Sequence, residues 1–189
     1  MRKAPLIGIN RLRLGTDGQG IRTLVAFHGC PLSCRYCLNP SCLSATAKVT
    51  YKPPEQIAKI LQKDALYFLA SRGGVTFGGG DPLLRSEFIR EVIKVYGKEK
   101  DVAIETSLNV PRNDIEIVLP LVNELFVDVK DMDPRIYKDY TGQYNGIGLQ
   151  IALTRNTKSY TVILRQNRFK HCQFLLRRAA KNNCLKSYD

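Results

Sequence analysis

The stretch GCPLSCRYC (residues 29–37) places three cysteines, Cys30, Cys34 and Cys37, within eight residues. Cysteine thiolates are the usual ligands of a 4Fe–4S cluster, and three of them would leave one of its four irons open for substrate chemistry. The spacing also suits a zinc site completed by Cys42, and a disulfide pair is a third alternative. Spacing alone therefore leaves a cluster, a zinc ion and a disulfide open.

Outward from the cysteine stretch, β-rich segments alternate with segments of helical periodicity. The expected strands span residues 21–27, 74–77, 102–106 and 125–130, and the expected helices span residues 54–71, 86–95, 114–122 and 134–140. Ser86 is the expected N-cap of the second helix. This alternation predicts an α/β fold, in which a parallel sheet with right-handed crossovers carries its helices outside. Such units close, or partly close, into a barrel.

Polar residues or glycines follow each of the four expected strands. The cysteine stretch follows the first strand, Gly78-Gly79-Gly80-Asp81 follows the second, Glu105-Thr106 ends the third and Asp128-Val129-Lys130 ends the fourth. Ligands of parallel α/β folds bind at the C-terminal ends of the strands. Because the alternation rests on apolar residues alone, the convergence of these residues on one rim is independent support for a ligand site.

Each strand end also has a simpler structural interpretation. Successive glycines let the backbone approach a ligand closely, but they are also common in turns. Glu105 has the alternative of an exposed acid at a strand end. Asp128 and Lys130 share one face of their strand, where a buried ion pair needs a ligand or a compensating network, yet the two can also form a plain salt bridge.

Composition and charge limit the possible partners. The 189 residues are 44% hydrophobic, which suits one domain with a sizeable core. Residues 150–189 carry nine Lys/Arg and one Asp/Glu, whereas residues 1–149 carry 20 and 16, a near balance that argues against nucleic acid as a partner. There is no membrane-length apolar run and no signal-peptide pattern, and clustered cysteines suit a reducing compartment. We therefore expect a cytoplasmic protein.

The cysteine stretch resembles the signature of the radical SAM enzymes, which bind S-adenosylmethionine (SAM). Its flanks narrow the resemblance to the glycyl radical enzyme activases, of which the pyruvate formate-lyase activase is the best known. The run Asp17-Gly18-Gln19-Gly20-Ile21-Arg22 is similar to the Asp-Gly-Pro-Gly-Ile-Arg of that subgroup, and Cys37-Leu38-Asn39-Pro40 is similar to its Cys-His-Asn-Pro. The fold that this resemblance implies is a partial (β/α) barrel.

The resemblance implies a site for one cluster and its cofactor. Cys30, Cys34 and Cys37 would hold one 4Fe–4S cluster, and SAM would chelate the fourth iron. Tyr36 corresponds to an aromatic residue that packs near the adenine. The residues Gly79, Gly80 and Asp81 resemble the end of a Ser-Gly-Gly-Glu-Pro motif that contacts the methionyl end of SAM.

Two further strand ends complete the implied site. Glu105 and Thr106 resemble an Asp-Thr pair which, with the aspartate corresponding to Asp128, helps to bind a monovalent cation. Lys130 belongs to an Asp-x-Lys motif and is a plausible partner of the SAM carboxylate. Asp17 would face the bound substrate peptide or SAM, although an Asp-Gly pair is also a turn signal.

The resemblance implies a reaction with a protein substrate. A reduced cluster, fed by a donor such as flavodoxin or ferredoxin, passes one electron to SAM. This gives methionine and a 5′-deoxyadenosyl radical, which takes a hydrogen atom from a glycine Cα of a partner glycyl radical enzyme. An anaerobic ribonucleotide reductase activase is an alternative suggested by residues 79–83, and a zinc-stabilised binding module is an alternative of another class.

The resemblance covers residues 7–149. We expect residues 1–149 to form the radical SAM core with an incomplete barrel, and residues 150–189 to form a basic C-terminal segment. A strand at residues 159–166 and a helix at 169–180 fit its pattern. Because its composition changes so abruptly, we hypothesise a frameshifted or otherwise altered barrel end, with a genuinely short activase as the competing view.

Overall fold

An open eight-stranded sheet organises the chain in a computed structural model, which describes residues 2–97, 100–131, 133–144, 161–166 and 185–187. Its strand order is β3-β1-β2-β4-β5-β6-β7-β8. The strands are β1 (Ala4–Leu14), β2 (Ile21–Phe27), β3 (Thr50–Lys52), β4 (Gly74–Gly79), β5 (Val102–Thr106), β6 (Glu124–Val129), β7 (Thr161–Gln166) and β8 (Leu185–Ser187). From β2 to β8 neighbouring strands run parallel, whereas β1 is antiparallel to both β2 and β3.

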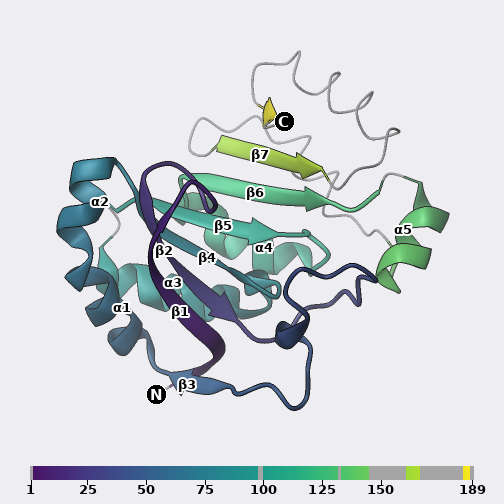
Figure 1. Cartoon of the computed structure of the whole chain (residues 1–189), viewed down its shortest axis with the longest axis horizontal. Helices are drawn as coiled ribbons and strands as arrows, with labels where there is room; N and C mark the ends of the chain where they lie inside the picture. The colour runs from purple at the N-terminus through teal and green to yellow at the C-terminus, as the bar shows by residue number, and fades with distance from the viewer. Residues whose placement is uncertain (1, 98–99, 132, 145–160, 167–184, 188–189) are drawn as a thin grey trace.

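Helices and short 3-10 turns connect the strands. The helices are α1 (Pro54–Lys63), α2 (Ala65–Ser71), α3 (Ser86–Tyr96), α4 (Arg112–Val118) and α5 (Pro134–Thr141), and the 3-10 turns are η1 (Pro40–Cys42), η2 (Pro82–Arg85) and η3 (Leu119–Leu121). Figure 1 shows α3 and α4 behind the sheet, and α5 beyond the arrowhead of β6. Within the described part of the chain, none of the helices combines the length and apolar character needed to cross a bilayer.

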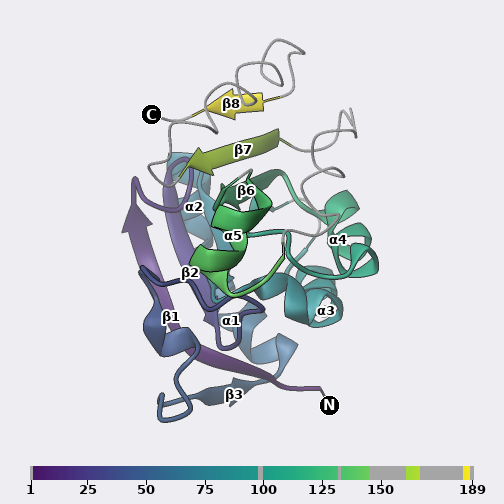
Figure 2. The same cartoon turned by 90° about the vertical axis from the view of Figure 1, so that its right-hand side faces the viewer.

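The main hydrophobic core lies between the sheet and its helices. Alternate strand residues, such as Val75 and Phe77 of β4, pack there against α1 and α3, where Leu61, Phe88 and Val92 are buried. The other set of alternate residues, which includes Glu105 and Asp128 of the predicted site, therefore points to the opposite face. In Figure 2, which is turned by 90°, α5 lies toward the viewer, at the ends of the parallel strands.

The expected α/β fold of parallel strands with outer helices is confirmed, and the sheet is open rather than closed among the described residues. The predicted strand at 159–166 appears as β7, while the predicted helix at 169–180 lies outside the described residues. The predicted 54–71 helix is divided at Asp64, whose buried carboxylate accepts hydrogen bonds from Arg11 and Thr23.

Two further expectations were wrong in detail. Ser86 is not the N-cap of α3, because it already lies inside the helix and its hydroxyl donates to Asp114 at 2.9 Å. The helix expected at 114–122 begins earlier, at Arg112, and ends at Val118. The chain continues as a 3-10 turn containing Pro120, which lacks the N–H that a longer α-helix would use.

Candidate functional site

A cavity of about 390 Å³ opens at the C-terminal ends of the parallel strands. Loops after β2, β4, β5 and β6 contribute to it, as expected for a parallel sheet. The predicted site residues that line it are Cys30, Cys34, Tyr36, Cys37, Gly79, Gly80, Asp81, Glu105, Thr106, Asp128 and Lys130. The structure thus brings together residues that are up to 100 positions apart in the sequence.

Backbone hydrogen bonds hold the cysteine loop at two places, near its start and against the end of α5. At its start, the Gly29 N–H donates to the Cys42 carbonyl at 2.8 Å. Further on, the Ser33 N–H donates to the carbonyl of Thr141 at 2.9 Å, at the end of α5. Arg35 adds an exposed ion pair with Asp139 of 2.6 Å. The loop that carries the three predicted ligands therefore has a defined position relative to the sheet.

The four cysteines of this region, Cys30, Cys34, Cys37 and Cys42, are free thiols in the structure, which does not support the disulfide alternative. Burial raises the pKa of Cys30 to about 12. Burial also raises the pKa of Cys34, and the Lys130 ammonium opposes that rise. The metal-free thiols of Cys30 and Cys34 are therefore protonated near neutral pH, and metal binding would release protons.

The chemistry of the donor set suits a 4Fe–4S cluster. A cluster distributes its thiolates over separate irons, so its ligands need to line one cavity rather than meet at one point. Cys30, Cys34 and Cys37 are free thiols that line one cavity, which fits this requirement.

The glycine run packs directly against the start of the cysteine loop. The Gly80 N–H donates to the Phe27 carbonyl at 3.0 Å, and the Asp81 N–H donates to the Gly29 carbonyl at 2.9 Å. A Cβ atom on Gly80 would lie 2.0 Å from that Gly29 oxygen, so only glycine allows this approach. Gly79 has a φ of +96°, in the region that favours glycine. The run therefore has a structural role in addition to the proposed cofactor contact.

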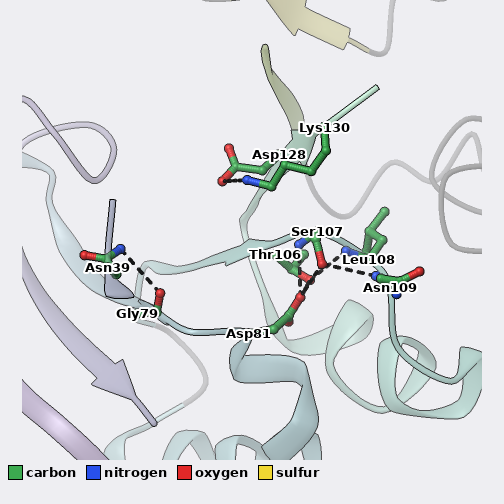
Figure 3. Close-up of polar contacts among 9 residues, drawn as sticks. All are labelled: Asn39, Gly79, Asp81, Thr106, Ser107, Leu108, Asn109, Asp128 and Lys130. Atoms are coloured by element: carbon green, nitrogen blue, oxygen red, sulfur yellow. Dashed lines mark hydrogen bonds and ion pairs between the residues drawn. The ribbon is translucent and has the colours of Figure 1, made fainter. Parts of the chain in front are cut away.

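Asp81 links β4 to β5 through its carboxylate (Figure 3). It accepts hydrogen bonds from the Thr106 hydroxyl, the Ser107 hydroxyl and N–H, and the Leu83 N–H, at 2.8–3.2 Å. Burial raises the pKa of Asp81, and the hydrogen bonds from Ser107 and Thr106 oppose that rise. A carboxylate has about four lone-pair sites, and these four donors occupy them. The structure thus uses internally the acceptor that the sequence suggested for the SAM ammonium.

The Glu105 side chain lies over Gly78, on the face of the sheet opposite the main hydrophobic core. A Cβ atom on Gly78 would stand 2.7 Å from the Glu105 Oε2 atom. Relative to the family pattern, Gly78 replaces a serine and Glu105 replaces an aspartate. The missing side chain at one position therefore makes room for the additional methylene at the other.

Asp128 and Lys130 form an ion pair of 3.3 Å at the cavity (Figure 3). The Lys130 side chain is 14% exposed and that of Asp128 is 41% exposed. Burial lowers the pKa of Lys130, but the charges of Asp128 and Cys34 outweigh that effect, so its pKa is raised overall. Lys130 is therefore an ammonium group at neutral pH and offers a positive charge to the cavity.

Asp17 is the predicted site residue that the structure does not place at the cavity. It lies in the loop before β2, at the opposite end of this strand from the cysteine loop. Its carboxylate pairs with Arg13, and its carbonyl accepts a hydrogen bond from Thr76 at 2.8 Å. Only 5% of the Asp17 surface is exposed, so in this structure Asp17 is a buried residue that stabilises the loop before β2.

Sequence reasoning missed several residues at the cavity. Ser107, Asn39 and Tyr140 also line it, as does Cys42, which the sequence suggested only for the zinc alternative. Asn39 donates from Nδ2 to the Gly79 carbonyl at 3.4 Å (Figure 3). The position of Ser107 directly after Glu105-Thr106 was an available signal, whereas the inclusion of Tyr140 depends on how α5 folds back.

Comparisons with known proteins agree with this geometry. The profile of the radical SAM superfamily matches residues 24–147. Similar relatives include a pyruvate formate-lyase-activating enzyme of Clostridium pasteurianum, which is 35% identical over 67% of this chain and 53% of its own length. A 4-hydroxyphenylacetate decarboxylase activating enzyme of Clostridium scatologenes is 30% identical over 79% of this chain and 68% of its own length. A (2S)-3-sulfopropanediol dehydratase activating enzyme of Klebsiella oxytoca is 28% identical over 79% and 66%.

The chain thus spans about half to two thirds of the length of these relatives. Solved structures share its fold at low sequence identity. QueE from Escherichia coli aligns with a TM-score of 0.59 at 14% identity, over 98% of this chain and 94% of QueE. Streptococcus suis SuiB, in a structure bound to S-adenosylmethionine, aligns with a TM-score of 0.63 at 14% identity, over 88% of this chain and 42% of SuiB.

Proposed function

The chain belongs to the radical SAM superfamily, a family that implies a 4Fe–4S cluster and SAM, and from this premise we propose that it activates a glycyl radical enzyme. Its curated relatives at 28–35% identity are named as activating enzymes. One observation carries the proposal. The three cysteines line the same cavity as the residues that follow β4, β5 and β6.

In this proposal Cys30, Cys34 and Cys37 hold the cluster, because their thiols surround the cavity. When bound, the reduced cluster and SAM supply a radical that takes a hydrogen atom from a glycine Cα of the partner enzyme. The chain's own residues bind and orient the reactants and exclude water. We infer a cytoplasmic location from the free thiols, which need a reducing compartment.

Cationic and aromatic side chains of the chain orient SAM in this proposal. Lys130 neutralises the SAM carboxylate, and its partner Asp128 keeps the ammonium directed to the cavity. Tyr36, 78% exposed beside the third cysteine, contacts the adenine. Backbone groups of Gly79 and Gly80 contact the methionyl end. Asp81 acts indirectly, because its carboxylate holds Thr106 and Ser107 in place.

We also propose a monovalent cation beside the SAM sulfonium. Glu105, Thr106 and Asp128 would supply its oxygen ligands. The Thr106 hydroxyl donates its proton to Asp81 and accepts the Leu108 N–H, which leaves one oxygen lone pair for a cation. Glu105 contributes a carboxylate one methylene longer than that of the family pattern.

The protein partner is a glycyl radical enzyme, and the electron donor is a protein such as flavodoxin or ferredoxin. The test is anaerobic reconstitution with iron and sulfide, reduction, and electron paramagnetic resonance (EPR) with and without SAM. We expect an axial signal of a reduced cluster whose line shape changes when SAM is added. A colourless protein that carries one zinc ion would support the zinc-module alternative instead.

A further inference from the structure

Tyr36 and Tyr140 form an aromatic pair in the wall of the cavity. Their ring centroids lie 6.1 Å apart, and the ring planes are inclined by 32°. Both residues line the cavity, Tyr36 from the cysteine loop and Tyr140 from α5. Aromatic pairs in proteins prefer centroid separations of about 4.5–7 Å, so this separation is that of a direct ring contact. The pair therefore joins the two segments at the cavity itself.

The two members of the pair differ strongly in burial. Tyr140 is 8% exposed, whereas Tyr36 is 78% exposed. An exposed side chain keeps its rotamer freedom unless a neighbour packs against it, and freedom that is lost on binding a ligand weakens that binding. Tyr140 is fixed by its place on an ordered helix. It is therefore the ring that limits where Tyr36 can lie.

Backbone hydrogen bonds at the end of α5 set the two tyrosines side by side. The last carbonyl groups of a helix have no partner within the helix. Here the Tyr140 carbonyl accepts from the Arg35 N–H at 3.0 Å, and the Thr141 carbonyl accepts from the Ser33 N–H at 2.9 Å. Arg35 directly precedes Tyr36, so the first of these bonds brings the pair together. Both bonds use main-chain atoms only, and they persist when the Tyr140 side chain is replaced.

We propose that Tyr140 is a positioning residue for SAM, which holds the Tyr36 ring at the cavity wall so that the ring is in place before the adenine arrives. This inference rests on the proposed function, in which Tyr36 contacts the adenine. A ring that is already in position loses little rotamer freedom on binding, so the affinity for SAM is higher. Because Tyr140 acts through Tyr36, the effect of losing Tyr140 is included in the effect of losing Tyr36.

The experiment measures SAM binding by equilibrium dialysis to anaerobically cluster-loaded wild type, Tyr140→Leu and Tyr140→Phe. We expect equal iron content in all three. Tyr140→Leu should bind SAM about three- to tenfold more weakly, the range expected for one aromatic pair, and Tyr140→Phe should recover most of the affinity because it keeps the ring. Unchanged affinity in Tyr140→Leu would overturn the inference. A folded Tyr140→Leu protein without iron would also overturn it, because Tyr140 would then be needed for cluster assembly.

A second background separates positioning from direct contact. When Tyr140→Leu is added to Tyr36→Leu, SAM binding should weaken no further than in Tyr36→Leu alone. An additive loss would overturn the inference, because Tyr140 would then contact SAM on its own account.

Tyr144 provides the matched control, since it follows α5, is 65% exposed and does not line the cavity. Tyr144→Leu should bind SAM as wild type does. A loss as large as that of Tyr140→Leu would contradict a role that depends on the contact with Tyr36.

The ring pair can also be tested without a cluster. In metal-free protein, urea unfolding of Tyr36→Leu, Tyr140→Leu and the double variant should show a coupling of about threefold in the unfolding equilibrium constant. The effects of Tyr36→Leu and Tyr144→Leu should simply add. Absence of coupling between Tyr36 and Tyr140 would overturn the inference and leave the proposed function standing. A wild type that takes up no cluster, with this coupling present, would instead overturn the proposed function.

Discussion

Gly78 and Glu105 depart together from the pattern of the family, and the structure relates the two departures sterically. The Glu105 carboxylate occupies the space where a Gly78 side chain would lie, at 2.7 Å from its Cβ position. The two positions are 27 residues apart in the chain, so the sequence alone offered no reason to connect them. Paired departures of this kind indicate that the site keeps its total volume while its carboxylate is repositioned.

This pair can be tested by a double-mutant cycle. Gly78→Ser should destabilise the protein by about 1 kcal/mol through overpacking, at the low end because the end of the Glu105 side chain can move. Adding Glu105→Asp should recover much of this loss, so that the two effects are not additive. Urea unfolding of both single variants and the double variant measures the coupling.

Gly8→Ser is a suitable control for that cycle, because a Cβ atom at Gly8 meets nothing within 4 Å. It should change the unfolding free energy little, and its effect should add to that of Glu105→Asp. Additive effects of Gly78→Ser and Glu105→Asp would mean that the two positions do not share their space.

The place of Asp81 at the cavity could be predicted from the sequence, but its hydrogen-bond partners could not. Its position after a strand and a glycine run correctly predicted a place at the cavity. Its hydrogen-bond partners Thr106 and Ser107 come from another strand, and no pattern local to Asp81 announces them. The set of donors that a carboxylate receives depends on tertiary contacts, which a pattern local to Asp81 does not contain.

At the scale of elements, α5 supports the cysteine loop and begins with a specific cap. Asp133 is its N-cap, and its carboxylate accepts the N–H groups of Arg135, at 2.8 Å, and Ile136. These backbone hydrogen bonds lower the pKa of Asp133 below its ordinary value of 3.8. The stabilisation is therefore complete above about pH 4 and is lost as the pH falls through the lowered pKa.

The corresponding prediction compares Asp133→Ala with Asp133→Ser. The alanine variant should be less stable than wild type at pH 7, and this difference should diminish as the pH falls from about 4 through the lowered pKa of Asp133, where the wild-type cap becomes protonated. The serine variant keeps a cap without a titrating group, so its stability should not show this acid-dependent change. Unfolding free energies between pH 3 and 7 give the comparison, and a difference that is the same at both pH values would contradict the assigned cap.

Strands were predicted correctly where the local sequence pattern determines them. A strand was missed where pairing between distant segments determines it. The strand at 102–106 was predicted with its observed bounds, and the one at 21–27 likewise, because both are rich in β-formers. The antiparallel strand β1 was missed. It carries Arg11 and Arg13, whose charges are matched by Asp64 and Asp17 only in the folded chain. The register of its pairing with β2 also shifts at two places, so its inward and outward residues do not alternate regularly along the whole strand.

At the scale of the whole molecule, the two ends of the parallel strands differ in function. The cavity lies at the C-terminal ends of the strands, whereas a hydrogen-bond network around Arg22 lies at the N-terminal end of β2. Arg22 is 1% exposed and donates to Asp101 at 2.7 Å, to the Thr76 hydroxyl at 2.7 Å and to the Val75 carbonyl at 2.8 Å. The motif containing Arg22 resembles that of the activases, and in this structure it has a structural role.

Arg22→Ala should therefore affect stability and not ligand binding. We expect a loss of about 3 kcal/mol in unfolding free energy, because buried acceptors lose a charged partner. The affinity for SAM, measured on cluster-loaded protein well below the unfolding temperature, should remain that of wild type. Arg112→Ala breaks an exposed pair with Glu116 and should cost no more than about 0.5 kcal/mol. Comparable losses in both variants would contradict the buried network.

The position of the site followed from topology, since polar residues after parallel strands must meet at one edge. The shape of the site did not, because it depends on how α5 folds back onto the cysteine loop through the Thr141 and Tyr140 carbonyls.

The central claim is that three specific thiols hold one four-iron cluster, and the iron and sulfide content of reconstituted protein tests it most directly. We predict about four irons and four sulfides per chain for wild type, the composition of one 4Fe–4S cluster. Cys42→Ala should keep this content and Cys34→Ala should lose it. Loss of metal in both variants, or one zinc per wild-type chain, would contradict the account.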